Sequence, residues 1–218
     1  MKKLVILGGS GIGMLAASIA HDLGVYEVCG FLNDYFEPGH LIGKYKKIPV
    51  IGRTLDLPKV LKSKNTYVFI AYVGLHKEKE TFQKIDSLKI PEDKFATLIH
   101  PTAIIPKDLC YIGNGVMMAP LSQIAADTTI SDCSLLLSNS YVGHDSTLEK
   151  FAHIATNSVI GANVHVGRGV HVGTNATIRE KVNIGDFALI GAGSVVLNNV
   201  PENAVIVGNP GRILKQRT

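Results

Sequence analysis

Two adjacent residues, His144 and Asp145, are the side chains in this sequence best suited to proton transfer. An imidazole, whose unperturbed pKa is about 6.5, suits a general base near neutral pH, and an adjacent carboxylate can orient it and raise its basicity. On an arbitrary scaffold the same pair would more often be an exposed histidine beside an acid. The pair therefore predicts chemistry only where the fold brings a substrate to it.

The segment around this pair is a six-residue repeat. Every sixth residue from Ile112 to Val196 is Ile, Leu, Val or Met, and the fourth residue after each is small or β-branched, from Val116 to Val200. This period fits a chain that coils around a triangular prism with one unit per face. An antiparallel β domain with regular turns is the alternative, but hairpins would not keep phase through so many units. Small residues that follow many of the apolar ones, such as Gly161, predict a tight bend in each unit.

Three units make one coil, so residues eighteen apart become neighbours in stacked coils. Ala162 is expected beside His144, and Asn163 beside Asp145. Backbone N–H groups of the next coil could then act as oxyanion donors to a reacting carbonyl.

Another pair of histidines, His153 and His171, shares one column of the repeat. A zinc site is conceivable there, but no acid or cysteine in the column completes a ligand shell, so no metal is expected. A hydrogen bond from His153 to a ligand is the better interpretation.

The first part of the chain reads as strands alternating with helices. Apolar runs at 3–7, 26–32 and 67–72 predict strands, and the segments 14–23 and 76–88 predict helices, which together indicate a parallel sheet. The turn Gly8-Gly9-Ser10-Gly11-Ile12-Gly13 would let a phosphate approach the start of a helix. Asp34, at the end of the second strand, could bind a ribose. An NAD site is the alternative, but the glycine spacing departs from GxGxxG and the domain is short, so half a dinucleotide site fits better.

Composition sets further limits on the class of protein. The chain has 218 residues, of which 46% are hydrophobic, and a formal charge of +4 without a basic run, which argues against nucleic-acid binding. Three scattered cysteines predict neither a disulfide framework nor a zinc site; we expect buried small hydrophobes. The absence of a signal peptide or a long apolar stretch predicts a cytoplasmic protein without membrane insertion. We expect two tightly joined domains, residues 1–95 and 96–218.

Basic residues gather toward the C-terminal end of the sequence. They could bind a phosphate-bearing cofactor, although a solvated basic face is the more ordinary interpretation. The residues are Arg168, Arg179, Lys181, Arg212, Lys215 and Arg217.

The repeat columns and several short motifs together resemble one enzyme family. The motifs are Phe31-Leu32-Asn33-Asp34, Ile48-Pro49-Val50-Ile51-Gly52, Ile99-His100-Pro101-Thr102-Ala103, His144-Asp145 and Gly208 to Arg212. The chain is similar over essentially its whole length to the hexapeptide-repeat sugar acyltransferases, which include the bacillosamine, perosamine and viosamine N-acetyltransferases and the sialic acid O-acetyltransferases. This resemblance implies an α/β Rossmann-like N-terminal domain that binds a nucleotide sugar, followed by a left-handed parallel β-helix.

The resemblance also implies an activity and a set of site residues. It implies a homotrimer with active sites between subunits, in which acetyl-CoA acetylates the 4-amino group of a nucleotide-linked 4-amino-4,6-dideoxy sugar in polysaccharide or glycan biosynthesis. His144 would accept the proton and Asp145 would strengthen it. The nucleotide-sugar contacts implied by motif are Ser10, Gly11, Ile12, Asn33, Asp34 and Gly52. The acetyl-CoA contacts implied in the same way are His153, Ala162, Thr174 and Ala192.

Position 12 and the side chains near His144 bear on the mechanism. This chain departs from many relatives, which carry histidine where it has Ile12, so the resemblance does not imply a polar side-chain contact to the substrate there. Direct transfer is expected without an acyl-enzyme, because the cysteines lie away from the His144 column and Ser146 is in the inward column.

Two alternative functions remain beside N-acetylation of a nucleotide sugar. They are O-acetylation of a sialic acid or related sugar, and a non-catalytic binding protein built on the same solenoid.

Overall fold

The computed structural model describes residues 1–72 and 77–217. These residues form two compact units, Met1–Ile99 and His100–Thr218. Each unit has its own core and is described by itself.

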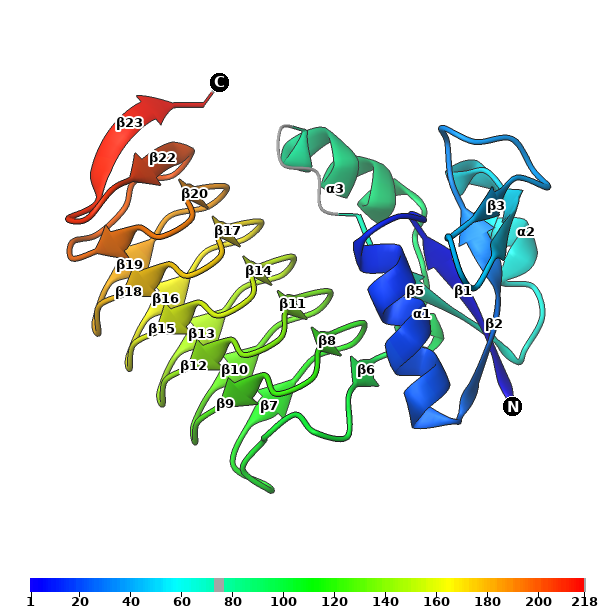
Figure 1. The fold of residues 1–218 in the computed structure, drawn as a ribbon, viewed down its shortest axis with the longest axis horizontal. Helices are drawn as coiled ribbons and strands as arrows, with labels where there is room; N and C mark the ends of the chain where they lie inside the picture. The colour runs from blue at the N-terminus through cyan, green and yellow to red at the C-terminus, as the bar shows by residue number, and fades with distance from the viewer. Residues whose placement is uncertain (73–76, 218) are drawn as a thin grey trace. The chain divides into compact units, whose positions relative to one another are not determined.

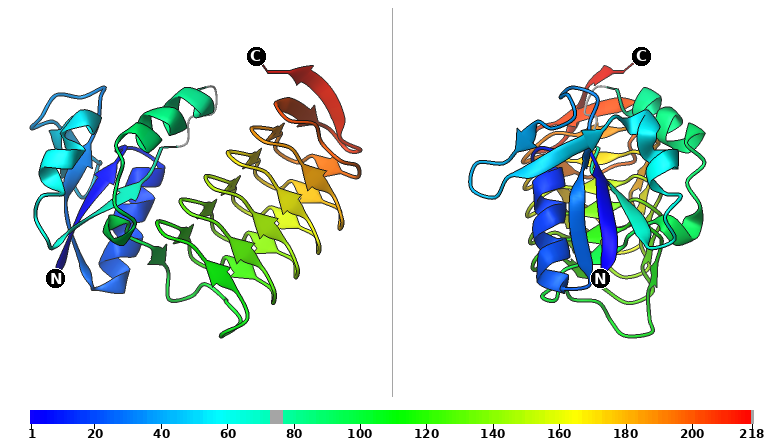
Figure 2. Two further views of the ribbon diagram at one scale, coloured as in Figure 1. Left: turned by 180° about the vertical axis from the view of Figure 1, so that it is seen from behind. Right: turned by 90° about the vertical axis from the view of Figure 1, so that its right-hand side faces the viewer.

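The first unit is a five-stranded sheet with helices on both faces. The strands are β1 (Lys2–Leu7), β2 (Tyr26–Leu32), β3 (Leu41–Ile42), β4 (Ile48–Gly52) and β5 (Thr66–Ile70), in the order β3-β4-β2-β1-β5. All neighbours are parallel except the β3–β4 pair, which is antiparallel. The helices are α1 (Ile12–Leu23), α2 (Leu57–Val60) and α3 (Glu78–Ser87), with short 3-10 turns η1 (Thr54–Asp56) and η2 (Glu92–Lys94). Figure 2 shows α1 and α3 on opposite faces of this sheet.

The predicted strands and helices of this unit are confirmed, with small differences at their ends. The second predicted helix corresponds to α3, which begins at Glu78 in the structure. Its predicted start at residue 76 lies outside the described residues. β3, β4 and α2 were not predicted from the sequence, because β3 has only two residues, β4 carries a proline, which weakens a strand pattern, and α2 has only four residues.

The second unit is a three-sided parallel β-helix (Figure 1), and the strand before it, β6 (Leu98–Ile99), extends one of its sheets. One sheet has the order β23-β22-β20-β17-β14-β11-β8-β6, and the others are β19-β16-β13-β10-β7 and β21-β18-β15-β12-β9. Every pair from β7 to β21 is parallel and joins residues eighteen apart, such as Tyr141 and Val159. The coil arithmetic is therefore confirmed.

Most strands of this unit contain two residues. They are β7 (Tyr111–Ile112), β8 (Met117–Met118), β9 (Gln123–Ile124), β10 (Thr129–Ile130), β11 (Leu135–Leu136), β12 (Tyr141–Val142), β13 (Thr147–Leu148), β14 (His153–Ile154), β15 (Val159–Ile160), β16 (His165–Val166), β17 (His171–Val172), β18 (Thr177–Ile178), β19 (Asn183–Ile184), β20 (Leu189–Ile190) and β21 (Val195–Val196). The longer strands β22 (Ala204–Val207) and β23 (Arg212–Gln216) close the end of the solenoid as an antiparallel pair.

Both columns of the repeat point into the β-helix. The large apolar residues from Met118 to Val196 are buried, and Ile112 in the first coil is half-buried. The small residues from Val116 to Val200 are all buried as well. Burial of these two columns in every coil is the hydrophobic driving force that holds the coils together.

The bends of the repeat differ from the prediction in their position. The left-handed backbone conformation occurs three residues after the inward apolar residue, as in Asn139 and Asn157, and not at the glycines directly after it. Those glycines are needed for another reason. A Cβ at Gly161 would lie 2.6 Å from the backbone nitrogen of Glu180 in the next coil, so the column must be free of side chains there.

Candidate functional site

The His144–Asp145 pair lies at an exposed edge of the β-helix, after β12. His144 Nδ1 and Asp145 Oδ2 are 2.6 Å apart, and both side chains are about half exposed. Asp145 has a φ of 57°, in the left-handed region that aspartate and asparagine adopt more readily than most residues. Hydrogen bonding of Nδ1–H to the carboxylate leaves the Nε2 lone pair as the basic nitrogen of the ring.

The next coil lies directly against this pair, as the eighteen-residue spacing predicts. The Asn163 N–H donates a 2.9 Å hydrogen bond to the His144 carbonyl oxygen. A Cβ on Gly143 would stand 2.7 Å from the Ala162 nitrogen. His144, Asp145 and the backbone of Ala162 are therefore brought together at one edge, while their roles in catalysis stay predictions.

The structure accounts for the side chains that could compete as nucleophiles. Ser146 is fully buried; its Oγ donates to the Gly161 carbonyl oxygen at 3.1 Å and accepts from the Val164 N–H at 3.1 Å. Cys133 is buried as predicted, but Cys29 and Cys110 are only half-buried, so the expectation of three buried cysteines was wrong for two of them. Cys29 is on β2 and Cys110 lies in the first coil.

The other predicted acetyl-CoA residues lie at a different edge of the prism. Thr174 follows β17 and Ala192 follows β20, both exposed and in neighbouring coils, with the Gly193 N–H bonded to the Thr174 carbonyl at 2.9 Å. His144 and Ala162 follow strands of another sheet. Within one chain, the face formed by β9, β12, β15, β18 and β21 separates the two edges.

His153 lies on the face next to the second edge and is paired with His171 in the following coil. Their Nδ1 atoms are 2.8 Å apart and their strands are in register. Burial, and secondly the neighbouring His171, lowers the pKa of His153 to about 3. Burial, and secondly Arg217, lowers the pKa of His171 to about 4. Both rings are therefore neutral near pH 7, and one proton is shared between the two Nδ1 atoms.

This pair does not have the surroundings of a metal site. In the described parts of the chain, no group of three or more His, Cys, Asp or Glu residues is placed to hold a metal ion. His153 Nε2 is buried and has no hydrogen-bond partner among the described residues, which marks a polar atom that a ligand or a rearrangement would have to satisfy.

In the first unit, the predicted phosphate turn joins β1 to α1. Gly8 and Gly11 both have positive φ values, and Ser10 and Gly11 are exposed. No side chain caps the helix start, and its first turn carries no acid, so its N–H groups are not countered by a protein carboxylate. Ile12, half-buried, is the first residue of α1.

Asn33 and Gly52 lie at the carboxyl ends of two neighbouring strands. Asn33 is buried, and its side-chain oxygen accepts hydrogen bonds from the N–H groups of Tyr35 and Phe36 at 2.8 and 3.2 Å. The Asn33 N–H donates to the Gly52 carbonyl at 3.0 Å. These two predicted contacts therefore come together and shape the loop after β2.

Asp34 holds three groups of the same loop cluster. Its oxygens accept from the Thr54 N–H and the Thr54 hydroxyl, both at 2.9 Å, and from Lys84 Nζ at 2.6 Å. Partial burial raises the pKa of Asp34, but the Lys84 ammonium and the Thr54 donors outweigh it, so the net pKa is lowered. The Tyr72 hydroxyl lies 3.0 Å from Thr54 Oγ1.

The sequence did not predict a role for Thr54, Tyr72 or Lys84. Thr54 and Tyr72 each follow a strand end by two residues, and Lys84 reaches the same cluster from α3. Its place at the end of the predicted strand 67–72 could have indicated Tyr72, but nothing in the sequence pairs Lys84 of α3 with Asp34.

Known proteins share both parts of this architecture. Residues 3–84 match the PglD N-terminal domain family. The acetyltransferase domain of PglB from Neisseria gonorrhoeae is 27% identical, with a TM-score of 0.84 over 98% of this chain and 100% of that one, and a structure of that domain holds acetyl coenzyme A. The resemblance to the sugar acyltransferases is thereby confirmed for both parts of the chain.

Two further solved structures show the same fold. Perosamine N-acetyltransferase from Caulobacter crescentus, solved with CoA and GDP-perosamine, is 24% identical, with a TM-score of 0.84 over 99% of this chain and 98% of that one. WeeI from Acinetobacter baumannii is 20% identical, with a TM-score of 0.73 over 98% of this chain and 100% of that one. The predicted α/β domain followed by a left-handed β-helix is thereby confirmed. No curated protein matches the sequence.

Within residues 1–72 and 77–217, none of the helices is both long and apolar enough to span a membrane.

Proposed function

We propose that this chain transfers the acetyl group of acetyl-CoA to the 4-amino group of a nucleotide-linked 4-amino-4,6-dideoxy sugar, with His144 as the general base. The observation that carries the proposal is the 2.6 Å contact between His144 and Asp145 at an exposed edge of a β-helix acyltransferase. The similarity to acetyltransferases with bound acetyl-CoA or CoA supports acetyl-CoA as the co-substrate.

The chemistry requires one base and no covalent intermediate. The neutral sugar amine attacks the thioester carbonyl, forming the C–N bond, and the amine proton passes to His144 Nε2. The C–S bond then breaks and the CoA thiolate leaves, taking the proton from His144 Nε2, so that the free thiol and the neutral imidazole are formed. Asp145 stabilises the imidazolium that forms in between, because its carboxylate accepts the hydrogen bond from the Nδ1–H group.

The nearby backbone supports the developing negative charge. The Ala162 backbone lies against Gly143, so an N–H of the next coil is a suitable donor to the thioester oxygen. Ser146 is engaged inside the prism and unsuited to act as a nucleophile. Direct transfer therefore fits the side chains present.

The placement of the predicted acetyl-CoA contacts supports a homotrimer. Thr174 and Ala192 lie at one edge of the prism and His144 at another. One acetyl group cannot contact both edges of the same chain, since a six-residue face spans up to about 20 Å. A site between two subunits would bring the edges together, with His153 and Ala162 completing the acetyl-CoA path.

The first unit supplies the expected groups for a nucleotide. The exposed turn at Ser10 and Gly11 offers backbone N–H groups to a diphosphate at the start of α1, beside Ile12. Asn33, Asp34 and Gly52 form the adjoining loop cluster. Its ordered hydrogen bonds would hold the sugar nucleotide at the carboxyl ends of the strands.

The test is a thiol-release assay with acetyl-CoA and a panel of UDP-, GDP- and dTDP-linked 4-amino-4,6-dideoxyhexoses. The proposal predicts release with one nucleotide class and a product heavier by one acetyl group that resists hydroxylamine. A product cleaved by hydroxylamine would be an ester and would indicate sugar O-acetylation instead. No thiol release with any amino or hydroxy sugar would favour a binding protein.

A further inference from the structure

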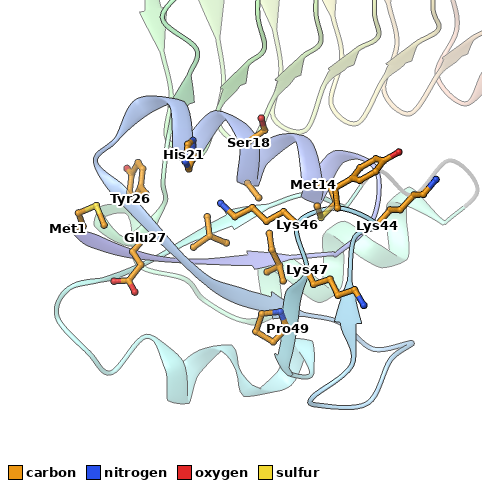
Figure 3. A pocket seen from close by; sticks show the side chains of 14 residues that line it. Met1, Met14, Ser18, His21, Tyr26, Glu27, Lys44, Lys46, Lys47 and Pro49 are labelled. Carbon is orange, nitrogen blue, oxygen red and sulfur yellow. The ribbon is translucent and has the colours of Figure 1, made fainter.

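A groove in the first unit extends along α1 from Met14 to His21. It has a volume of about 690 Å³ and runs between α1 and the segment that leads into β4. Figure 3 shows Met14, Ser18 and His21 on the helix side and Lys44, Lys46 and Lys47 on the opposite segment. Pockets of roughly 300–1,000 Å³ are the usual size for small-molecule sites.

The groove exists because the sheet lacks one covering element. The connection from β2 to β4 contains only the two-residue strand β3, where a parallel sheet usually has a helix. The side of β2 and β4 next to α1 is therefore open. Its floor is apolar and includes Ala17, Val28, Ile48 and Pro49.

One rim of the groove carries an unusual concentration of positive charge. Lys44, Lys46 and Lys47 are exposed, and none makes an ion pair with the residues that the structure describes. Glu27 is the acidic residue of the lining. Three ammonium groups against one carboxylate would favour a negatively charged ligand group.

One end of the groove lies far from the phosphate turn, while Met14, two residues after Ile12, lines its other end. Met1, Tyr26 and Ile48 of its lining lie at the starts of β1, β2 and β4. The nucleotide contacts proposed above, such as Ser10 and Asn33, follow the ends of the strands. Strands of this length span about 20 Å, so one nucleotide phosphate cannot reach both ends.

We propose that this groove binds a small amphipathic organic anion, with its apolar body on the floor and its carboxylate or phosphate group at Lys44, Lys46 and Lys47. An apolar floor beside a cationic rim is complementary to such a molecule and offers little to a neutral sugar. The enclosed volume suits a ligand of this size rather than a protein segment, which needs a far larger buried surface.

The chain contains no tryptophan, so Tyr45→Trp at the rim gives a single fluorescent reporter. Tyr45 is 91% exposed, and its replacement should leave the fold intact. Octyl phosphate and octanoate are titrated into the full chain below their aggregation limits, with octanol and octylammonium as matched neutral and cationic probes. The proposal predicts a saturable blue shift with one or both anions and none with the cation, and the stronger anion identifies the preferred head group.

Two variants in the reporter background test the groove itself. Lys44→Glu/Lys46→Glu/Lys47→Glu should weaken anion binding at least tenfold, whereas Lys59→Glu/Lys62→Glu/Lys64→Glu, an equal charge change outside the groove, should leave it nearly unchanged. Ser18→Phe, at an exposed helix position in the lining, should block the groove and abolish the shift.

Several outcomes would overturn the proposal. Octanol binding as tightly as octyl phosphate would remove the role of charge, and loss of binding in both lysine variants would show non-specific attraction. Displacement of octyl phosphate by UDP, GDP or dTDP would place it in the nucleotide site. A changed oligomeric state of Ser18→Phe in sedimentation would identify the groove as a contact between copies of the chain.

Discussion

His144 Nδ1 lies 2.6 Å from Asp145 Oδ2, and the two residues are neighbours in the chain. Adjacent side chains usually diverge, but the left-handed turn at Asp145 directs its carboxylate back to the ring. The contact fixes the ring in one tautomer with Nε2 as the base, which is the state that proton transfer from an amine requires.

Replacement of Asp145 by asparagine should separate this electronic role from the fold. Asparagine already occupies the same left-handed position in other coils, as Asn139, Asn157 and Asn163, so Asp145→Asn should fold normally. We expect kcat to fall by about tenfold or more, because the ring loses its carboxylate partner. Steady-state kinetics measures kcat, and the thermal unfolding midpoint measures the stability of the fold. An unchanged kcat with an unchanged midpoint would show that Asp145 has no part in the reaction.

A side chain at Gly143 should damage the edge that carries His144. The Cβ of Gly143→Ala would stand 2.6 Å from the Gly161 carbonyl carbon, so the coils must separate locally. We expect a loss of about 1–3 kcal/mol of stability together with reduced activity.

The matched control for that variant is Gly193→Asn. Gly193 has a φ of 69° with open space around its Cβ position, and asparagine holds the same turn position in other coils. Thermal unfolding should therefore distinguish the two glycines. Equal midpoints for the two variants would contradict the role assigned to close coil contact.

The neutral pair His153 and His171 should make stability depend on pH. The folded pKa values of about 3 and about 4 lie below the unfolded value of about 6.5, so the unfolded state binds protons first. Stability is complete above pH 6.5 and falls as the pH drops from there toward 4, by up to about 1.4 kcal/mol per pH unit for each histidine.

The double variant His153→Leu/His171→Leu tests this dependence. Leucine already stands in the column of the two histidines, as Leu135 in the coil before them and Leu189 in the coil after them. The substitution therefore suits the outer face of the sheet. The difference in unfolding midpoint between pH 7.5 and pH 5 should be smaller in the variant than in the unmodified chain. An equal difference would assign the acid sensitivity to other groups.

Asp34→Asn should weaken the loop cluster of the first unit. The variant loses the ion pair with Lys84, while Thr54 still finds an acceptor oxygen. We expect a raised KM for the nucleotide sugar with an unchanged KM for acetyl-CoA. Lys59→Ala, whose exposed ion pair with Asp56 belongs to the same unit, is the control and should change neither value. Equal effects on both substrates would contradict a local role.

The fold could be predicted from the sequence because its signal is periodic. Each coil repeats the same two inward columns, so fifteen units carry the same information, and a local irregularity such as the half-buried Ile112 does not disturb the phase. The neighbours of His144 followed from that phase alone. The left-handed turn at Asp145 could not be predicted from the repeat, because the glycines mark positions of close contact between coils and not the positions of the bends.

The nucleotide end of the candidate site was only partly predictable. Asn33 and Asp34 were found because polar residues at a strand end are a local signal. Lys84 and Thr54 form hydrogen bonds with Asp34, although they lie 50 and 20 residues after it in the sequence. No short sequence pattern encodes such contacts. The His153–His171 column was visible, but its burial and low pKa values depend on packing that the spacing does not give.

The central claim is that His144 accepts the amine proton during direct acetyl transfer, and the most direct measurement is the kcat of His144→Ala with acetyl-CoA and the accepted nucleotide sugar. The exposed His165→Ala, on another face of the β-helix, is the matched control. We predict a fall of about a hundredfold or more for His144→Ala, with the KM for acetyl-CoA little changed and His165→Ala at the unmodified rate. Turnover of His144→Ala near that of the unmodified chain would contradict the account.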